Sequence, residues 1–406
     1  MLTRLKSLLR PPERKASRIA RLIALESGGR ARWTPRDYAA LAREGYARNA
    51  VVYRAVRLIA ESVGSLCFVL YEGAAERDAH PLLDLIRRPN PRQDGASFLE
   101  SVASHLLLAG NAYVEAVGFG GEGGAPDNNV QGHLQVRELY ALRPDRMKLV
   151  PGPDGWPQAY DYTVAGSTVR FAQNAALPPI LHLSFFNPLD DHYGLSPLEA
   201  AAIAVDTHNA AAVWNKALLD NAARPCGALV YDGADGLGLT AAQMDRLKAD
   251  FAEQYQGAGN SGRPLILEGG LEWKAMSLTP HDMDFLEAKH AAAREIALAF
   301  GVPPMLLAIP GDNTYSNFQE ANRVFWRQSV LPLAGRIGCA LTHWLAPVFG
   351  DGLMLSVDTD RIEALSADRA ALWDRVSKAP FLSVNEKRLA TGYGPVEGGD
   401  VFQSPQ

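Results

Sequence analysis

The sequence predicts an α+β chain built from two or more substructures. Between residues 136 and 186, four short runs with strand patterning alternate with turn residues, which is typical of a mostly antiparallel sheet. An alanine-rich helical pattern then runs from Ser196 to Ala223, and its small side chains on several faces indicate packing of helix on helix. The chain has 406 residues, 47% of them hydrophobic and 21% charged, which suits a folded protein with more than one core.

Charge is distributed unevenly along the chain. Residues 1–36 hold ten Lys or Arg against Glu13 and Glu26, a net charge of +8, so the overall −5 leaves −13 for the rest. We interpret residues 1–37 as a basic flexible arm, with contact to nucleic acid or an acidic partner as the alternative. No apolar run approaches the ~20 residues that span a bilayer, so no membrane partner is expected. Three widely separated cysteines without a CxxC pair predict buried free thiols in a reducing compartment.

The first half alternates helices and strands. Asn49 is placed to cap a helix whose apolar residues recur at helical spacing. Residues 80–88 predict a short helix that ends at Pro89. Ser97 is predicted to open a further helix as a capping box, and Gly110 to end it. The predicted strands are residues 66–71, 112–117, 136–140, 147–150, 159–162 and 180–183.

The long helix begins at Ser196, with Pro197 at its first position, and stops before Pro225. A compact insertion follows, with predicted strands at residues 227–231, 264–268 and 271–276 and a helix at residues 240–255. Eight acidic and four basic residues give the range 225–282 a net charge of −4.

A second long helix is predicted from the N-cap Thr279 to Gly301, where prolines forbid its continuation. A polar loop, residues 309–315, separates it from a third helix that opens at Ser316 as a capping box. Pro332 is expected to kink this third helix, which resumes to about Trp344. Helical patterns at residues 361–377 and 383–390 complete the chain.

This order of elements, and the letters EIALAFGVPPMLLAIPGDNTYSNFQEAN of residues 295–322, resemble the portal proteins of long-tailed bacteriophages and of phage-derived gene transfer agents. The ending TGYGPVEGGD, residues 391–400, is similar to that family as well. The resemblance implies a portal fold with wing, stem helices, αβ clip and small helical crown, assembled into a dodecameric ring. The implied divisions are a basic arm 1–37, wing 38–195, stem helix 196–224, clip 225–282, stem helix 283–302, tunnel loop 303–316, long wing helix 317–350 and crown region 351–406.

The resemblance also implies a function and partners. A portal conducts double-stranded DNA without sequence preference during packaging and ejection, and connects head to tail. The expected partners are the terminase large subunit, a head–tail connector or adaptor protein and the major capsid protein. The expected location is the portal vertex of a virion or phage-like particle, assembled in the bacterial cytoplasm, and the sequence leaves open whether that particle is an infectious phage or a gene transfer agent.

The resemblance places a DNA-facing tunnel loop between the second and third helices. No Lys or Arg occurs from Leu306 to Phe318, which fits a bore that must not hold phosphates in place. Four cations on the stem helices are candidates for keeping DNA centred, with ordinary salt bridging as the favoured alternative. His208 and Trp214 on the first stem helix are expected to pack between subunits. The tunnel-loop candidates are Asp312, Asn313, Thr314, Tyr315 and Ser316, and the stem candidates are Lys216, Arg224, Lys289 and Arg294.

Sequence motifs for catalysis are missing from this chain. It has no Walker A, HExxH, GxSxG or GxGxxG motif and no zinc-spaced Cys/His cluster, so neither catalysis, a metal nor a cofactor is expected. The alternative is an oligomeric cytosolic enzyme with an unrecognised site, for which the best residues are His182, Asp190, Asp191 and His192. Three adjacent residues on one loop are poorly placed to ligate a single ion, so a polar loop tip is the favoured interpretation of the last three.

Overall fold

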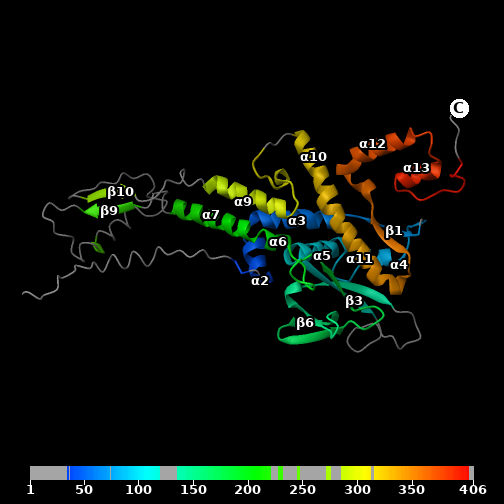
Figure 1. The fold of residues 1–406 in the computed structure, drawn as a ribbon, viewed down its shortest axis with the longest axis horizontal. Coiled ribbons are helices and arrows are strands. Elements are labelled where there is room, and N and C mark those ends of the chain that lie inside the picture. Colours follow the sequence, from blue (N-terminus) through cyan, green and yellow to red (C-terminus); the bar gives the residue numbers. More distant parts are fainter. Residues whose placement is uncertain are drawn as a thin grey trace, which may run out of the picture. The chain divides into compact units, whose positions relative to one another are not determined.

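The computed structural model describes residues 34–35, 37–73, 75–118, 135–220, 227–231, 245–246, 271–275, 285–311 and 315–401. The chain divides into two compact units, Met1–Thr34 and Pro35–Gln406, and all the described helices and strands belong to the second. They mix helices with antiparallel sheets, so the α+β prediction is confirmed (Figure 1). The helices are α2 (Tyr38–Leu41), α3 (Ala50–Gly64), α4 (Pro81–Arg87), α5 (Gly95–Ala109), α6 (Pro197–Ala200), α7 (Ala202–Asp220), α9 (Phe285–Ala299), α10 (Tyr315–Phe325), α11 (Leu331–Phe349), α12 (Ser366–Ser377) and α13 (Val384–Ala390).

Shorter helical turns link these helices. The segments η1 (Ala42–Tyr46) and η5 (Trp326–Val330) are π-helical. The 3₁₀ turns are η2 (Pro144–Arg146), η4 (Pro304–Leu307), η6 (Thr359–Arg361) and η7 (Glu363–Leu365).

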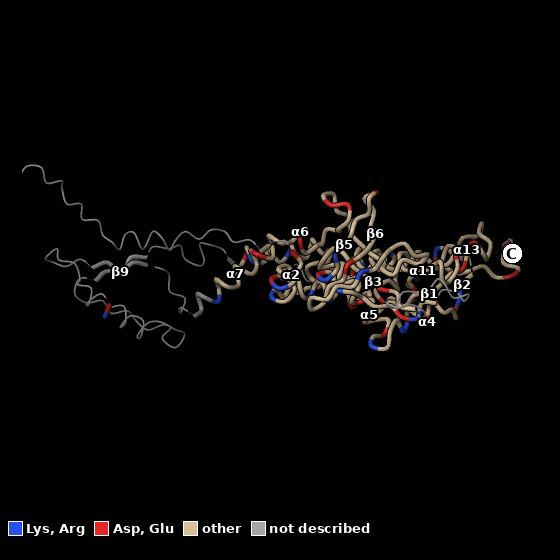
Figure 2. Tube along the Cα trace, turned by 90° about the horizontal axis from the view of Figure 1, so that it is seen from below, with Lys and Arg blue, Asp and Glu red and all other residues tan. Residues whose placement is uncertain are grey.

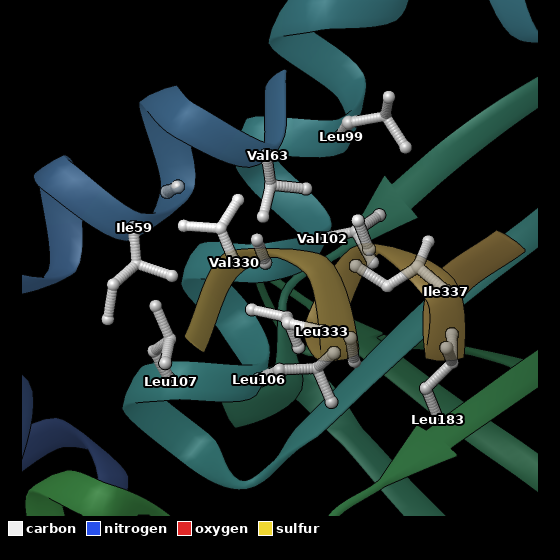
Figure 3. Close-up of a cluster of buried hydrophobic side chains, with 14 of the residues drawn as sticks. Ile59, Val63, Leu99, Val102, Leu106, Leu107, Leu183, Val330, Leu333 and Ile337 are labelled. Atoms are coloured by element: carbon white, nitrogen blue, oxygen red, sulfur yellow. The ribbon is translucent and has the colours of Figure 1, made fainter. Parts of the chain in front are cut away.

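The main core lies where α3, α5 and α11 meet. Figure 3 shows aliphatic side chains from all three helices converging with Leu183 of the strand β8 (Ile180–Ser184) and Val330 of η5. The apolar positions of α3 recur at helical spacing, so one face of this helix is buried while its polar residues face outward. The labelled core residues of the three helices are Ile59, Val63, Leu99, Val102, Leu106, Leu107, Leu333 and Ile337.

Three small antiparallel sheets accompany these helices. In one, β3 (Asn111–Gly118) lies between β4 (Val136–Leu142) and β8. In the second, β6 (Pro157–Val164) lies between β5 (Met147–Pro151) and β7 (Ser167–Ala172). In the third, β1 (Phe68–Glu72) pairs with β2 (Ala75–Arg77) and with β11 (Leu353–Val357), and α11 packs against this sheet. A second apolar cluster joins the first two sheets, and it is formed by Tyr113, Met147, Leu149, Tyr160 and Ile180.

Most predicted elements are present, with corrections at some ends. The side chain of Asn49 accepts from the amides of Val51 and Val52, as predicted for a cap. The helix predicted to open at Ser97 starts earlier, because Asp94 is its N-cap and accepts from the Ser97 amide. Strands β2, β7 and β11 were missed by the sequence analysis.

The third predicted helix is interrupted before Pro332, as the sequence suggested. The π-helical segment η5 separates α10 from α11, and it lies directly before the proline. A π turn accommodates a local disruption of the α-helical hydrogen bonding, which Pro332 causes because it has no N–H. The helix then continues past Trp344, the expected end, to Phe349.

Two cysteines depart from the burial predicted for them. Cys67 and Cys339 are free, but both are exposed. Cys67 lies between Leu66 and Phe68, which are both buried, so the alternation of an extended chain turns its thiol outward. Cys226 lies outside the described residues.

Candidate functional site

The helices α7 and α9 form the pair predicted as the stem. They pack side by side (Figure 1), and each buries several small side chains. Alanines at a helix–helix contact allow the two backbones to approach closely, which explains the alanine-rich sequence. The small or aliphatic residues that are buried on these helices are Ala202, Ala204, Val205, Ala211, Ala292, Ala293, Ile296 and Ala297.

A buried polar network ties α7 to the N-terminus of α3. The amide nitrogen of Asn49 lies 3.1 Å from Nδ1 of His208 and donates to Oδ1 of Asn209 at 3.0 Å. The Asn209 amide in turn donates to the carbonyl of Glu44. Burial, with a contribution from the charge of Lys289, lowers the pKa of His208, so this imidazole is neutral and accepts from Asn49.

His208 therefore packs within its own subunit, which corrects the prediction that it packs between subunits. The sequence signal was ambiguous because His208 and Trp214 occur on the same alanine-rich helix. The structure separates them, since His208 is buried and Trp214 is exposed.

The outward face of α7 is largely apolar. Ile203, Val213 and Trp214 are exposed large hydrophobic residues, and Val213 is 69% exposed. Val213 and Trp214 follow Ile203 by ten and eleven positions, which places all three residues on one side of a helix with 3.6 residues per turn. Exposed large apolar residues on a helix whose opposite side is already packed favour a contact with another molecule.

The start of the predicted tunnel loop is fixed to α9. Ile309 is buried against Ala293 and Ala297, one turn apart on that helix. Between these alanines, Arg294 donates through Nη2 to the carbonyl of Pro310 at 2.7 Å. The segment before Ile309 is the turn η4, which Ala308 closes in the left-handed conformation at φ 55°.

A second contact joins the end of α9 to the helix that follows the loop. Ser329 Oγ, in η5, donates to the carbonyl of Gly301 at 2.5 Å. Gly301 has a positive φ of 66°, which glycine adopts without strain. A Cβ at this position would also lie 2.9 Å from the Ser329 hydroxyl, so a larger residue would crowd this contact. The sequence analysis found the helix-ending Gly301 and missed Ser329, since no local pattern connects residues so far apart.

The structure places some predicted channel residues and leaves others undescribed. Asp312, Asn313, Thr314 and Arg224 lie outside the described residues. Tyr315 and Ser316 form the first turn of α10, so this helix begins one residue before the predicted capping serine. Their role in a channel remains a prediction.

The three described stem cations lie in different surroundings. Lys216 is exposed on α7 and Lys289 is partly buried on α9, where its charge reaches His208. Arg294 is bonded to the loop, as described above. Acidic and basic residues are interspersed along the described trace (Figure 2).

The four residues of the enzyme alternative have structural partners or lie on a loop. The ring of His182 stacks on that of Tyr113, with 4.4 Å between the ring centroids. Its Nδ1 lies 3.2 Å from the Tyr160 hydroxyl, and its Nε2 lies 2.9 Å from Asn111 Oδ1. Because Asn111 Oδ1 also accepts from the Gly194 amide, it is an acceptor for His182, which fixes the proton on Nε2. Burial lowers the pKa of His182 to about 4, so the ring is neutral.

The loop residues after His182 shape the backbone. Asp190 Oδ1 accepts from the amides of His192 and Tyr193, which lowers the pKa of this carboxyl. Asp191 is exposed beside it. Among the described residues, no three His, Cys, Asp or Glu side chains gather as metal ligands, and no described helix is long and apolar enough to cross a bilayer.

Sequence comparison relates this chain to known portal proteins. An uncharacterized protein of Rickettsia bellii is 39% identical over 361 residues, covering 88% of this chain and 90% of the relative. The portal protein of Enterobacteria phage HK97 is 26% identical over 371 residues, covering 86% of this chain and 80% of the phage protein.

Solved structures and a family model agree with this relation. A chain in the neck of a native gene transfer agent particle, computed with C12 symmetry, is 49% identical, with a TM-score of 0.66 and coverage of 94% of this chain and 100% of that one. The family model described as "Phage portal protein" matches residues 50–392. With most of its length matched in this way, the chain belongs to the phage portal protein family.

Proposed function

We propose that this portal protein assembles into a closed dodecameric ring through which double-stranded DNA passes, without sequence preference, during packaging and ejection. The observation that carries the proposal is the apolar outward face of α7, with Ile203, Val213 and Trp214 exposed. An isolated subunit leaves this face in water, whereas a neighbouring copy buries it. The C12 symmetry of the 49% identical neck chain supports the same stoichiometry.

The location that we propose is the portal vertex of a phage-like particle. The identity of 49% to a gene transfer agent chain, against 26% to the HK97 portal, favours a gene transfer agent. The protein acts in this proposal as a structural conduit without catalysis or cofactor of its own. ATP hydrolysis belongs to the terminase motor that docks on the ring.

The range 225–282 is the proposed docking surface for the terminase large subunit and for a head–tail connector. Its two described strands, β9 (Gly227–Tyr231) and β10 (Leu271–Ala275), pair antiparallel, and both agree with the sequence prediction. The net charge of −4 over this range favours partners with a basic surface. The major capsid protein is the proposed neighbour of the wing.

The segment 303–316 is the proposed lining of the narrowest part of the channel. Its middle is held by Ile309 and by the bond from Arg294 to Pro310, so its position relative to α9 is set before Gly311. The lack of Lys or Arg from Leu306 to Phe318 suits passage of a polyanion.

A double substitution tests the channel. Asn313→Lys with Tyr315→Lys puts two rings of positive charge in the bore, which attract phosphates most strongly at low salt. We expect rings in normal yield by electron microscopy and a reduced DNA content per particle. The matched control, Asn313→Gln with Tyr315→Phe, changes the same positions without charge and is expected to package normally. Equal DNA content in the lysine variant and the control would place this loop outside the channel.

A further inference from the structure

Strand β7 lies at the edge of its sheet, and its register there is firmly set. The turn Ala165–Gly166 joins it to β6 with φ of 48° and 84°, and the cross-strand pairs from Val164 to Ala159 run without a bulge. A two-residue turn with positive φ fixes the register of a hairpin. Among the described elements, β6 alone packs extensively against β7. The strand is therefore already formed on the side that faces away from β6.

The phase of the ladder shows which backbone groups of β7 face outward. The Gln173 amide donates to the Gln158 carbonyl at 2.9 Å, so this pair faces inward. In an antiparallel ladder the direction of pairing alternates from one residue to the next. Thr168, Arg170 and Ala172 therefore direct their N–H and C=O groups away from β6, and no hydrogen bond joins these groups to another described residue. We call these backbone groups the open edge.

The neighbouring sheet edges are closed within the subunit. On β4, Leu139 uses both of its backbone groups, because its amide donates to the Pro89 carbonyl at 2.7 Å and its carbonyl accepts from the Asn90 side chain at 2.9 Å. On β5, the Leu149 amide donates to the Tyr193 hydroxyl at 2.9 Å. Side chains and loops of the same chain thus occupy the edges that another strand could otherwise join.

Helix α11 closes two further edges. On β8, Arg336 donates to the Ser184 carbonyl at 2.6 Å, and on β11 the Leu355 amide donates to the Thr342 hydroxyl at 3.2 Å. The remaining edge of the three sheets, β2, is only three residues long. Proteins shorten, cover or charge their edge strands because an unpaired edge is a template for another strand. In these three sheets, β7 is thus the long edge that the described chain leaves open.

The side chains beside the open edge specify which strand fits it. Val169 is 52% exposed and Phe171 is half-buried against the second apolar cluster, so the inner face offers apolar surface at alternate positions. On the outer face, the ladder places Lys148, Asp161 and Arg170 in one row, with the carboxylate between the two cations. An acidic residue opposite Arg170 continues this alternation of charge. The open edge therefore fits an extended segment in which apolar residues alternate with polar ones, one of them acidic.

A second copy of this chain is poorly suited to be that segment. Neighbouring copies in a cyclic ring meet through different surfaces, so two β7 strands cannot pair with each other there. The other long edges of the three sheets are closed, so a neighbour offers none of them to β7. These two arguments favour a strand from a different protein.

We propose that a neighbouring protein of the particle adds an extended strand to the open edge. This inference rests on the proposed function, in which the major capsid protein is the neighbour of the wing, and it takes that protein as the source of the strand. In strand addition, backbone hydrogen bonds supply the affinity. The residues that face Val169, Phe171 and Arg170 supply the specificity.

Hydrogen exchange of the full-length protein, resolved to single amides, tests where the strand binds. In rings alone, the amides of Thr168, Arg170 and Ala172 should exchange rapidly, and purified major capsid protein should slow them by about tenfold or more. The amides of Val169 and Phe171, which face β6, serve as the internal reference. Protection of the open edge in rings alone would show that this chain itself fills it, and would overturn the inference.

Substitutions on β7 give a second readout. Thr168→Pro removes one outward N–H and leaves the ladder to β6 in place, since an edge strand tolerates proline where its N–H faces solvent. We expect the Kd of rings for the capsid protein to rise by about tenfold or more, whereas the matched control Thr168→Val keeps the N–H and should bind like the wild type. Wild-type affinity of Thr168→Pro overturns the inference.

A charge reversal covers the case in which the proline variant does not fold. Arg170→Glu keeps the backbone N–H but places a carboxylate opposite the acidic residue of the added strand, so it should weaken binding, whereas Arg170→Lys should not. Equal binding by these two variants contradicts the proposed partner chemistry.

The inference and the proposed function fail separately. A wild-type chain that forms no rings, or rings that bind no capsid protein, contradicts the proposed function. Rings that bind the capsid protein while the open edge still exchanges rapidly contradict this inference alone.

Discussion

Replacement of His182 by glutamine should make the protein less sensitive to mild acid. The unfolded chain binds a proton at His182 with the ordinary histidine pKa of about 6.5, whereas burial holds the pKa in the folded state at about 4. The stability that follows from this difference is present above pH 6.5, and it is lost as the pH falls toward 4, because the unfolded state then binds the additional proton.

The magnitude follows from the two pKa values. Between pH 7 and pH 5, a histidine with these values lowers the free energy of unfolding by about 2 kcal/mol. His105, half-buried on α5, has its pKa lowered to about 4 by the same desolvation and contributes a similar amount. We therefore expect the wild type to lose about 4 kcal/mol from these two groups and His182→Gln to lose about 2 kcal/mol.

Urea unfolding at a fixed protein concentration measures this difference, since association would otherwise shift the midpoint. Glutamine retains an amide that donates to Asn111 and a carbonyl that accepts from Tyr160, so the variant is expected to fold. His343→Gln makes the same change at an exposed side chain of α11 and serves as the matched control variant. Parallel stability curves for His182→Gln and the wild type between pH 7 and pH 5 would refute the assignment of a buried neutral ring.

Two further predictions concern packing. Ile337→Ala, at a fully buried position of α11, should lower the free energy of unfolding by about 2–5 kcal/mol. Leu298→Ala, at a side chain that is 79% exposed, should change the free energy of unfolding of the isolated subunit by under about 1 kcal/mol. Urea unfolding of both variants decides whether α11 is central to the core. Gly110→Ala should destabilise the subunit far more than Gly155→Ala. Both glycines have positive φ, but only at Gly110 would a Cβ lie 2.4 Å from the Gly194 carbonyl. Equal shifts in thermal midpoint would contradict this close approach.

Local chemistry predicted many helix ends of this fold. Asn49, Ser196, Gly110 and Ser383 act within one turn of the elements they cap or end, and the structure has each of them in that role. The capping serine predicted at Ser97 was wrong because two acceptable caps lie three residues apart, and Asp94 is the one that accepts from the first turn. Strands β3, β4 and β5 could likewise be predicted from the sequence, since each alternates buried and outward residues or is flanked by turns.

Long-range pairing was not readable from the sequence. Strand β11 is five residues long, and its partner β1 lies near the other end of the sequence, so no local pattern marks Leu355 as the partner of Leu70. The contact from Arg294 to Pro310 has the same character, because the sequence shows only a cation on a helix face. The candidate channel residues came from resemblance to a family, and composition or spacing alone would have left them as an ordinary surface loop.

The pairing of β1 with β11 also affects the order in which a ribosome can deliver a foldable subunit. Once Glu72 has been synthesised, the chain must grow by a further 285 residues, to Val357, before β1 can complete its pairing. At bacterial translation speeds this interval is roughly 15 to 60 s, during which the edge of β1 that β11 will occupy stays unpaired. A nascent chain that terminates early therefore lacks the strand that closes this sheet. Only subunits translated beyond Val357 can therefore complete this sheet, so its folding finishes late in synthesis.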